Sequence, residues 1–328
     1  DFGYKVLVLC EKKINLPESC NIEIIQLGEG ISKPRWISHV NFSRKVATWL
    51  QSNVCCKYLV HSHERVSSHH VTTIHSTLFN FPFRVGFPSL RKFINEKLEK
   101  REINENSVRC VVPVSNVIAE QIKKKYPRSV TKLSTPINPG IDKLNFKKPD
   151  RAKHKLVKVG FMGQEWKRKG LPKVIKIWRS LARKDVNCQL VLAGFPSTEN
   201  IGLSNAEMGR VKILGWLKDK SLFYSNIDIL LHPAKREAYG MVIAESASLG
   251  IPFLCSSECG ASILANEGYG RAIPECSSIE AWVEQLMSAL DQDNSGKAYE
   301  RSWSQVAKEY SKLYERIDCS PHPKLIAK

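Results

Sequence analysis

Two carboxylates stand eight residues apart in an apolar stretch of this sequence. The stretch HPAKREAYGMVIAESASLGIP, residues 232–252, contains Glu237 and Glu245, with Gly240 between them. Burying a carboxylate is costly unless a partner pairs with it. Either basic neighbours such as Arg236 pair with these carboxylates, or the carboxylates hold a ligand. Pairing suits Glu237 better than Glu245, because the neighbours of Glu245 along the chain are apolar.

The same stretch has the pattern of a strand at 227–233, a short loop and a helix at 241–250. At the start of that helix, the backbone N–H groups of Gly240, Met241 and Val242 are expected to be free. Free N–H groups and the helix dipole stabilise an anion there. Glu245 lies about one turn into the helix. Its carboxylate is placed to accept hydrogen bonds from vicinal hydroxyls, such as those of a ribose.

A second group of candidate residues lies in GFMGQEWKRKG, residues 160–170. The pattern predicts a strand that ends at Gly163 and a helix that begins near Gly170, with Arg168 and Lys169 between them. Two cations at a helix N-terminus suit a phosphate group. A solvated basic turn explains the same residues equally well. The spacing matches neither the Walker motif nor G-x-G-x-x-G.

Short apolar runs alternate with helical patterns through the whole sequence, which predicts parallel sheets covered by helices. Ligands bind at the carboxyl ends of the strands in such sheets, and the candidate residues lie at those ends. The stretch 134–150 is rich in Pro, Gly, Asn and Asp, as is typical of a linker. We therefore expect domains at 1–140 and 141–300, with a C-terminal helix and tail at 301–328 that packs back on the first domain.

The composition narrows the class of protein. The chain has 328 residues and a net charge of +18, which fits nucleic acid, an anionic membrane or a phosphate-rich substrate as partner. No nucleic-acid-binding motif is present, so nucleic acid is the less favoured partner. The ten cysteines lack zinc-site spacing and indicate reduced thiols in the cytoplasm. No apolar run reaches the roughly 18 residues of a membrane span, so we expect a soluble protein.

The segment 78–101 interleaves aromatic and basic side chains. It suits contact with an anionic membrane or with a phosphorylated lipid acceptor. The alternative is a loop whose aromatic rings pack inward, followed by a solvated helix. The aromatic residues of this segment are Phe79, Phe81, Phe83, Phe87 and Phe93.

Together the two groups of residues resemble the retaining glycosyltransferases of family 4, which have the GT-B fold of two Rossmann-like domains facing a cleft. The resemblance covers FMGQEWKRKG, LVLAG, VKILGWLKDK, YSNIDILLHPAKREAYGMVIAESASLGIPFLCS and the linker INPGID. Within the family, residues 228–252 are most similar to enzymes that add a sugar to the core of bacterial lipopolysaccharide.

The resemblance implies a role for each candidate residue. Glu237 and Glu245 match the E-x7-E motif, in which the first carboxylate contacts the donor sugar and the second holds the ribose. Arg168 and Lys169 match the pair that neutralises the diphosphate. The remaining matches are the strand-end glycine Gly163, the phosphate-binding amides of Gly240, Met241 and Val242, the base-binding Gly215 and Trp216, and His75 near the sugar and acceptor.

The resemblance also implies a reaction: transfer of a sugar from a nucleotide sugar, most commonly a UDP-sugar, to a glycan or lipid-linked acceptor with retention of configuration. No metal or cofactor is implied, and the D-x-D at Asp291–Asp293 is interpreted as a helix end and turn. Two features depart from the family. The N-terminal domain is expected to lack the first strand, Gly-rich loop and helix of the family, and Gln164 stands where many relatives have Arg. The alternatives are a catalytically impaired nucleotide-sugar-binding relative and a basic nucleic-acid-binding protein.

Overall fold

The computed structural model describes residues 3–12, 21–30, 34–53, 58–78, 90–144, 156–196, 200–291, 298–317 and 325–327. The chain forms two compact units. Unit 1 comprises Asp1–Asn138 and Ser304–Lys328, and unit 2 comprises Pro139–Trp303. Residues Phe79, Phe81, Phe83, Phe87 and Asp293, which the sequence analysis singled out, lie outside the described residues.

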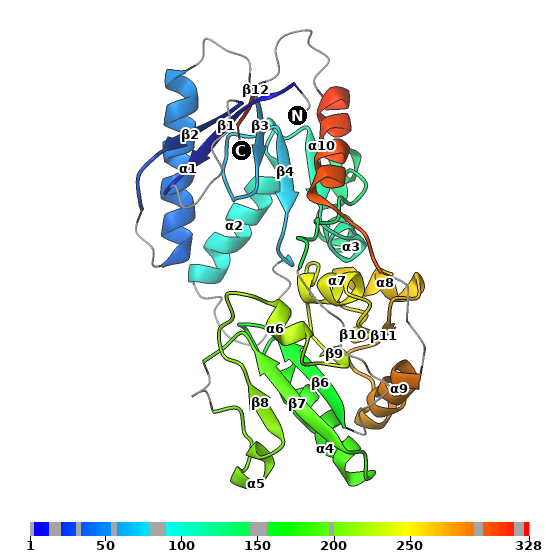
Figure 1. Ribbon diagram of the computed structural model, residues 1–328. Helices are drawn as coiled ribbons and strands as arrows, with labels where there is room; N and C mark the ends of the chain where they lie inside the picture. The colour runs from blue at the N-terminus through cyan, green and yellow to red at the C-terminus, as the bar shows by residue number, and fades with distance from the viewer. Residues whose placement is uncertain are drawn as a thin grey trace. The chain divides into compact units, whose positions relative to one another are not determined.

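Unit 1 contains a six-stranded parallel sheet in the order β2-β1-β12-β3-β4-β5 (Figure 1). The strands are β1 (Lys5–Cys10), β2 (Ile22–Gln26), β3 (Tyr58–Ser62), β4 (Val71–Ile74), β5 (Cys110–Pro113) and β12 (Leu325–Ala327). The helices are α1 (Arg35–Ser52), α2 (Leu90–Asn104), α3 (Asn116–Lys125), η1 (Pro127–Lys132) and α10 (Trp303–Ile317).

A strand from the far end of the chain occupies the centre of this sheet. The backbone of β12 pairs in parallel with β1 on one side and with β3 on the other. The sheet thereby acquires the order 3-2-1-4-5-6 of nucleotide-binding α/β folds, with β12 in the place of strand 1. The sequence analysis expected this domain to lack its first strand and did not predict that residues 325–327 would occupy that position.

Placing proline at Ile326 is expected to destabilise unit 1. Ile326 pairs with Val6 and Leu59, and proline removes a ladder N–H from a strand that has neighbours on both sides. We expect the free energy of unfolding to fall by about 3 kcal/mol, the cost of a proline in a helix interior, where a backbone hydrogen bond is lost in the same way. Chemical denaturation of Ile326→Pro, with Ile326→Val as the control, measures this. Equal stability of the two variants would show that β12 contributes little to the sheet.

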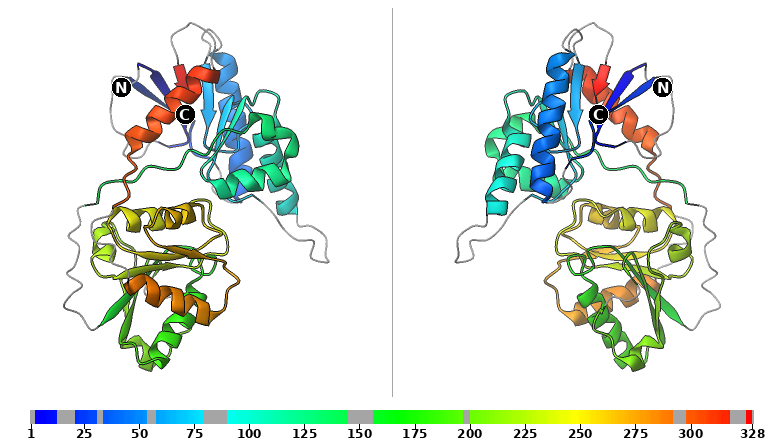
Figure 2. Two further views of the ribbon diagram at one scale, coloured as in Figure 1. Left: turned by 90° about the vertical axis from the view of Figure 1, so that its right-hand side faces the viewer. Right: turned by 90° about the vertical axis from the view of Figure 1, so that its left-hand side faces the viewer.

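Helices cover both faces of the unit 1 sheet. Leu7 and Leu9 of β1 pack with Val46 of α1 in one core. Leu59 of β3 packs with Tyr314 of α10 in another. Because neighbouring residues of a strand point to opposite faces, the two helices lie on opposite sides of the sheet, and Figure 2 shows this arrangement.

Unit 2 contains a second parallel sheet in the order β11-β10-β9-β6-β7-β8. This is again the order 3-2-1-4-5-6, and the strand order reverses between β6 and β9. The strands are β6 (Val157–Met162), β7 (Cys188–Ala193), β8 (Val211–Ile213), β9 (Ile229–His232), β10 (Phe253–Ser256) and β11 (Arg271–Ile273). The helices are α4 (Leu171–Arg183), α5 (Asn205–Met208), α6 (Ser221–Tyr224), α7 (Met241–Ser248), η3 (Gly260–Ser262), α8 (Ile263–Asn266) and α9 (Ile279–Asp291).

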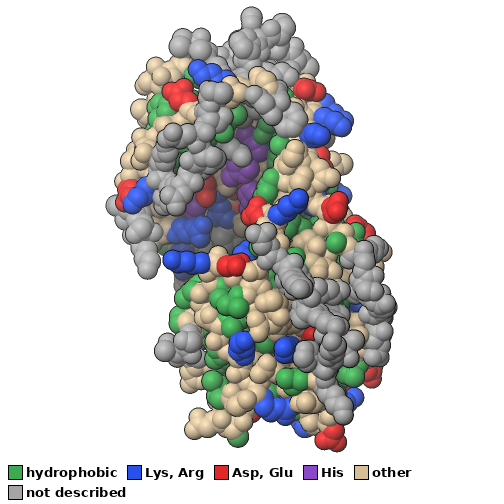
Figure 3. Space-filling model, viewed as in Figure 1, with side chains coloured by type: hydrophobic (Ala, Val, Ile, Leu, Met, Phe, Trp, Pro, Cys, Tyr) green, Lys and Arg blue, Asp and Glu red, His purple; other side chains and the backbone are tan. Residues whose placement is uncertain are grey.

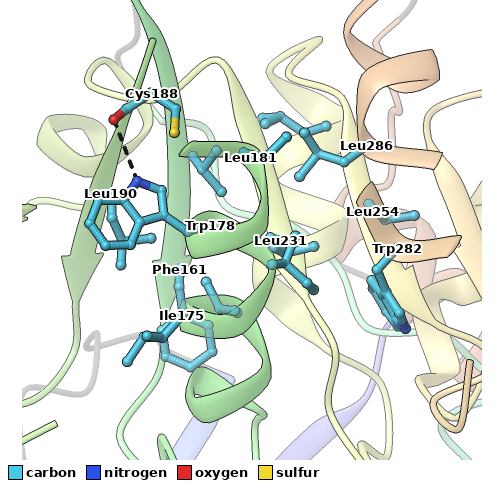
Figure 4. Packing of buried hydrophobic residues seen from close by; sticks show 14 of the residues in the cluster. Phe161, Ile175, Trp178, Leu181, Cys188, Leu190, Leu231, Leu254, Trp282 and Leu286 are labelled. Atoms are coloured by element: carbon cyan, nitrogen blue, oxygen red, sulfur yellow. Dashed lines mark hydrogen bonds between the residues drawn. The ribbon is translucent and has the colours of Figure 1, made fainter. Parts of the chain in front are cut away.

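The main core of unit 2 lies between this sheet and helices α4 and α9. Phe161, Leu190 and Leu231 of the sheet pack against Trp178 and Trp282 of these helices (Figure 4). The predicted strand that ends at Gly163 and the predicted strand at 227–233 agree closely with β6 and β9, and the predicted helix starts agree with those of α4 and α7. The C-terminal helix expected within 301–328 is α10. Within the described ranges, no helix combines the length and the hydropathy that a membrane crossing requires.

Candidate functional site

The candidate site lies at the carboxyl ends of β6 and β9, the adjacent strands between which the strand order reverses. This is the position where open α/β sheets bind ligands. Residues 163–170 follow β6 and lead into α4, while residues 233–240 follow β9 and lead into α7. The fold therefore brings the two groups of candidate residues together, although about 70 residues of sequence separate Lys169 from Glu237.

Glu237 is the residue on which the two loops converge. Its Oε2 lies 3.4 Å from Arg168 Nη1 and 3.4 Å from Lys169 Nζ. Burial alone would raise the pKa of this carboxyl, but His232, Lys169 and Arg168 together lower it to about 2. Burial lowers the pKa of His232, so its ring is neutral at pH 7. The charge that holds Glu237 ionised therefore comes from Lys169 and Arg168.

Contacts between the loops fix the two cations. Arg168 donates from Nε to Glu165 Oε2 at 2.7 Å and from Nη1 to the carbonyl oxygen of Arg236 at 2.5 Å. The stem of Lys169 lies over Gly163, where an added Cβ would stand only 2.4 Å from Lys169 Cδ. Gly163 thus matters because it has no side chain, which lets Lys169 reach Glu237.

Backbone bonds to the segment after β10 hold Glu237 in place. The N–H of Glu237 donates to the carbonyl oxygen of Glu258, and the N–H of Gly260 donates to the carbonyl oxygen of Glu237. Ser256 Oγ also donates to the carbonyl oxygen of Ala234 at 2.7 Å. The loop 233–240 is therefore anchored at Ala234 and at Glu237, and its carboxylate has a fixed position.

The N-terminus of α7 lacks a side-chain cap. Gly240 adopts a left-handed conformation with φ of 98°, and its carbonyl oxygen accepts from the N–H groups of Ile243 and Ala244. Among the described residues, no acceptor contacts the N–H groups of Met241 and Val242. These groups point out of the helix end and are available to an anion.

Glu245 is buried in the middle of α7 and has two partners. Tyr224 donates to its Oε2 at 2.6 Å, and Lys220 donates to its Oε1 at 2.6 Å. Burial and the neighbouring carboxylate raise the pKa of Tyr224 well above its usual value, so the phenol remains a donor. The expectation that pairing suits Glu237 better than Glu245 is wrong. Both carboxylates are paired, and in the described contacts the side chain of Arg236 binds neither.

Gly215 and Trp216 follow β8 at the same edge of the sheet. The carbonyl oxygen of Gly215 accepts from the N–H of Gly194, and Gly194 lies against Gly163. The strand ends of β6, β7 and β8 therefore form a continuous row. The Trp216 side chain is 58% exposed, and its ring is available for stacking.

His75 belongs to unit 1 and follows β4, whereas the other candidate residues all belong to unit 2. Its Nε2 lies 2.7 Å from His63 Nδ1, and the two rings are stacked. His61 is a buried structural residue, because its ring nitrogens contact Tyr314 and Thr73. Figure 3 shows histidine side chains gathered on the face of unit 1 that it draws.

Three residues near the carboxylates were not selected from the sequence: His232, Tyr224 and Lys220. His232 is fully buried, and its Nε2 lies 3.8 Å from Glu237 Oε2. Neither of its ring nitrogens has a hydrogen-bond partner among the described residues. The feature of the sequence that could have indicated His232 is its position as a polar residue after the apolar run IDILL, immediately before Pro233. Tyr224 and Lys220 carry no such signal, because only the packing of α6 against α7 brings them to Glu245.

Comparison with known proteins identifies related sequences and folds. The family model for glycosyl transferases group 1 matches residues 142–309, just over half of the chain. The lipopolysaccharide glucosyltransferase WaaG of Escherichia coli K12 is 30% identical over 155 residues, or 46% of this chain and 40% of WaaG. The capsular polysaccharide biosynthesis glycosyltransferase CapM of Staphylococcus aureus is 25% identical over 150 residues, or 43% of this chain and 40% of CapM. The match thus spans about two fifths of the length of each relative.

Solved structures establish the fold. The crystal structure of WaaG superposes with a TM-score of 0.74 at 20% identity, covering 97% of this chain and 92% of that one. The structure of Anabaena HepE in complex with UDP and glucose gives a TM-score of 0.58 at 14% identity, covering 95% and 99%. The prediction of an α/β GT-B fold with two Rossmann-like domains is confirmed.

Proposed function

The chain belongs to the glycosyl transferases group 1 family, and on that premise we propose that it transfers a sugar from a nucleotide-sugar donor to a glycan or glycolipid acceptor. One observation carries the proposal. Two cations and one ionised carboxylate meet between the carboxyl ends of β6 and β9, beside the uncapped N-terminus of α7. This arrangement fits a group that bears both a diphosphate and hydroxyls.

In the proposed mechanism, Arg168 and Lys169 bind the diphosphate of the donor together with the N–H groups of Met241 and Val242. The bond between the anomeric carbon and the diphosphate oxygen breaks, and negative charge builds on the diphosphate. Fixed cations and amide dipoles stabilise that charge without reorganisation. The acceptor oxygen then bonds to the anomeric carbon, and its hydroxyl proton passes to an oxygen of the departing diphosphate. The chain supplies both cations itself, so the proposed reaction needs no metal.

Glu237 and Glu245 contribute as hydrogen-bond acceptors. With a pKa of about 2, Glu237 is ionised at neutral pH. It can accept from a sugar hydroxyl and oppose the positive charge that develops on the sugar ring. We assign Glu245 to the ribose hydroxyls, with Lys220 moving aside or remaining bound to the second carboxylate oxygen. The exposed ring of Trp216 and the turn at Gly215 are assigned to the base.

UDP is the nucleotide that we propose for the donor, with retention of configuration. The structure of HepE with UDP and glucose supports this choice. The similarity to WaaG, a lipopolysaccharide glucosyltransferase, supports lipopolysaccharide as the acceptor. We propose a sugar of the lipopolysaccharide core as the acceptor and the inner face of the cytoplasmic membrane as the place of the reaction. On the described part of segment 78–101, Phe93 is 49% exposed and Lys97 Nζ lies 4.5 Å from the centre of its ring, which supports contact of this helix with an anionic membrane.

Replacing Glu237 with Gln tests the assignment of the donor site. We expect release of nucleoside diphosphate from the preferred donor to fall about 100-fold, in the range seen when one charge-stabilising group is lost. Binding of the nucleotide alone should change little, because its phosphates contact the cations. UDP-, GDP- and ADP-sugars are first compared by thermal shift, since a ligand that binds the native state raises apparent stability.

The exposed Glu284→Gln on α9 is the matched control and should retain full turnover. Because the pKa of Glu237 is about 2, its protonation should not limit the wild-type rate between about pH 4 and pH 8. Donor binding without turnover in the wild type would identify a catalytically impaired relative. Wild-type turnover in Glu237→Gln would remove Glu237 from the site.

A further inference from the structure

A buried imidazole lies beside the donor site, at the end of β9. The side chain of His232 has no exposed surface, and its backbone pairs with Cys255 of β10. The ring is stacked with that of Phe161 of β6, with ring centres 6.3 Å apart and planes inclined by 16°. This packing fixes the direction in which the ring nitrogens point. The proposed mechanism as described so far does not use them.

The N–H of this ring lacks an acceptor at hydrogen-bond distance. Among the described residues, neither ring nitrogen of His232 has a hydrogen-bond partner, and a buried polar atom of this kind requires an explanation. Because burial lowers the pKa of His232, the ring is neutral and carries one N–H. Nε2 lies 3.8 Å from Oε2 of Glu237, and this carboxylate favours the tautomer with the proton on Nε2. The N–H thus points at an acceptor that stands just too far away.

The three neighbours of the Glu237 carboxylate within the described residues all stand at the same oxygen. Arg168 Nη1 and Lys169 Nζ each lie 3.4 Å from Oε2, and His232 Nε2 lies 3.8 Å from it. The other oxygen, Oε1, takes part in none of these contacts. One side of the carboxylate is therefore held by the protein, and the other side is available to a ligand.

Donor binding weakens two of these three contacts. In the proposed function, Arg168 and Lys169 bind the diphosphate, whose charge exceeds that of one carboxylate and competes for both cations. The side chain of Glu237 is only 14% exposed, and a carboxylate so enclosed requires hydrogen bonds to remain ionised. His232 is not drawn to the diphosphate, because its ring is uncharged and enclosed. It is the neighbour that remains with Glu237.

A neutral donor suits this position better than a third cation. Positive charge develops on the sugar ring as the bond to the diphosphate breaks, and an imidazolium beside Glu237 would oppose that charge less favourably than a neutral ring. A hydrogen bond of about 2.9 Å requires Nε2 and Oε2 to approach by about 0.9 Å. Rotation of the Glu237 side chain can supply this movement while the backbone of Glu237 remains bonded to Glu258 and Gly260.

We propose that His232 is a positioning residue for Glu237. When Arg168 and Lys169 bind the diphosphate, Nε2 of His232 donates to Oε2 of Glu237. Oε1 of Glu237 then faces a hydroxyl of the donor sugar. The assignment rests on the proposed function and adds to it the group that orients the carboxylate during transfer. His232 itself does not contact the donor.

Two amide substitutions test where the hydrogen-bond donor must stand. The side-chain nitrogen of Gln can reach the place of Nε2, whereas that of Asn reaches only the place of Nδ1. The kcat for release of nucleoside diphosphate should fall about tenfold in His232→Asn and His232→Leu, as expected when a hydrogen bond to a charged group is lost. In His232→Gln it should stay within about threefold of the wild-type value, since the bond is retained. The KM for donor should change less than about twofold in all three variants, because the diphosphate contacts the cations.

Chemical denaturation separates this role from a structural one. Asn and Gln both place an amide in the apolar space beside Phe161, so both are expected to lower the free energy of unfolding. A kcat that is lost in His232→Asn and recovered in His232→Gln therefore reports on the hydrogen bond and not on stability. A kcat that follows stability across the three variants, without recovery in His232→Gln, would overturn the proposal.

The variant Glu237→Gln provides a second test. If His232 acts through Glu237, the effects of the two substitutions are not additive. His232→Leu should then lower kcat by less than about twofold in the Glu237→Gln background, compared with about tenfold in the wild type. Equal losses in both backgrounds would show that the ring acts on another group, and the proposal would be wrong.

Nuclear magnetic resonance tests the proposed bond without a change at position 232. In protein labelled with ¹⁵N-histidine, the Nε2–H proton of His232 should move downfield when UDP is added, and Glu237→Gln should abolish this shift. The dependence on Glu237 identifies the resonance, so the measurement stays decisive even if the His232 variants do not fold. If no histidine N–H resonance shows a UDP-induced shift that depends on Glu237, His232 does not donate to this carboxylate.

The wild type separates failure of this proposal from failure of the proposed function. Donor turnover in the wild type, together with wild-type kcat in His232→Leu, would overturn the assignment of His232 alone. If the wild type neither binds nor turns over UDP-, GDP- or ADP-sugars, the proposed function is wrong and the assignment of His232 is wrong with it.

Discussion

Replacing Lys169 with Met is expected to slow donor turnover by a factor of 10² to 10³, the range found when one group that stabilises transition-state charge is removed. Lys169 lies in the loop between β6 and α4, and its side chain is 19% exposed. A cation in this partly enclosed position interacts more strongly with a developing phosphate charge than one in open solvent. Methionine preserves most of the stem that covers Gly163 and removes only the charge.

The experiment measures kcat and KM for release of nucleoside diphosphate, together with equilibrium binding of the nucleotide. A loss concentrated in kcat indicates that Lys169 acts mainly on the transition state, whereas a rise in KM alone indicates ground-state binding. Lys176→Met on the exposed side of α4 is the control for losing one positive charge from unit 2. Wild-type kcat and KM in Lys169→Met would exclude Lys169 from the diphosphate site.

Lys169→Met also changes the electrostatics of Glu237. Burial raises the pKa of Glu237, and the two cations lower it. With one of the two cations removed, the pKa of Glu237 should therefore rise from about 2. The low pKa contributes stability that is fully present above the unfolded pKa of about 4.5 and is lost as the pH falls through about 2. Part of that contribution should therefore be absent from Lys169→Met at neutral pH, so its unfolding is measured alongside its kinetics.

The sequence indicated the residues of the proposed donor site because each part of that site is local. The carboxylates, the cation pair and the helix start each lie in one continuous stretch, and the alternation of strands and helices indicates that these stretches meet at the strand ends. The partners of Glu245 were not predictable in the same way. Lys220 and Tyr224 lie 25 and 21 residues before it, and only the packing of α6 on α7 defines the contact.

Unit 1 shows a second limit of the sequence. Three residues at 325–327 are too short a run to predict a strand, and only the space between β1 and β3 makes their pairing favourable. The sequence also did not predict the cavity of about 500 Å³ in unit 1. Residues of β1, of β3, of the segments that follow these strands and of α1 line this cavity, and no single motif contains Glu11, Arg35 and Glu64. Short-range patterns thus predict single elements, and sites whose parts each carry a motif, whereas contacts between elements without a motif require the structure.

Replacing Gly170 with Ala is expected to destabilise unit 2 by about 3 kcal/mol or more and to abolish most donor binding. Gly170 has a φ of 90°, which alone costs an L-residue about 1–2 kcal/mol. An added Cβ would also stand 2.2 Å from the carbonyl oxygen of Pro233. Because this atom is backbone, relief requires the two loops to separate, and overpacking of this kind costs a further 1–3 kcal/mol or so.

Gly202 provides a matched control for this prediction. It also has a positive φ, of 77°, but apart from its own chain neighbours no atom of the described residues lies within 4 Å of the position of an added Cβ. Gly202→Ala therefore measures the conformational cost alone, and the difference between the two variants measures the contact between the loops. Separation of the loops would move Lys169 away from Glu237, since these residues lie on opposite sides of the contact. Chemical denaturation and nucleotide binding are measured for both variants. If Gly170→Ala loses no more stability or affinity than Gly202→Ala, the contact between Gly170 and Pro233 does not position the site.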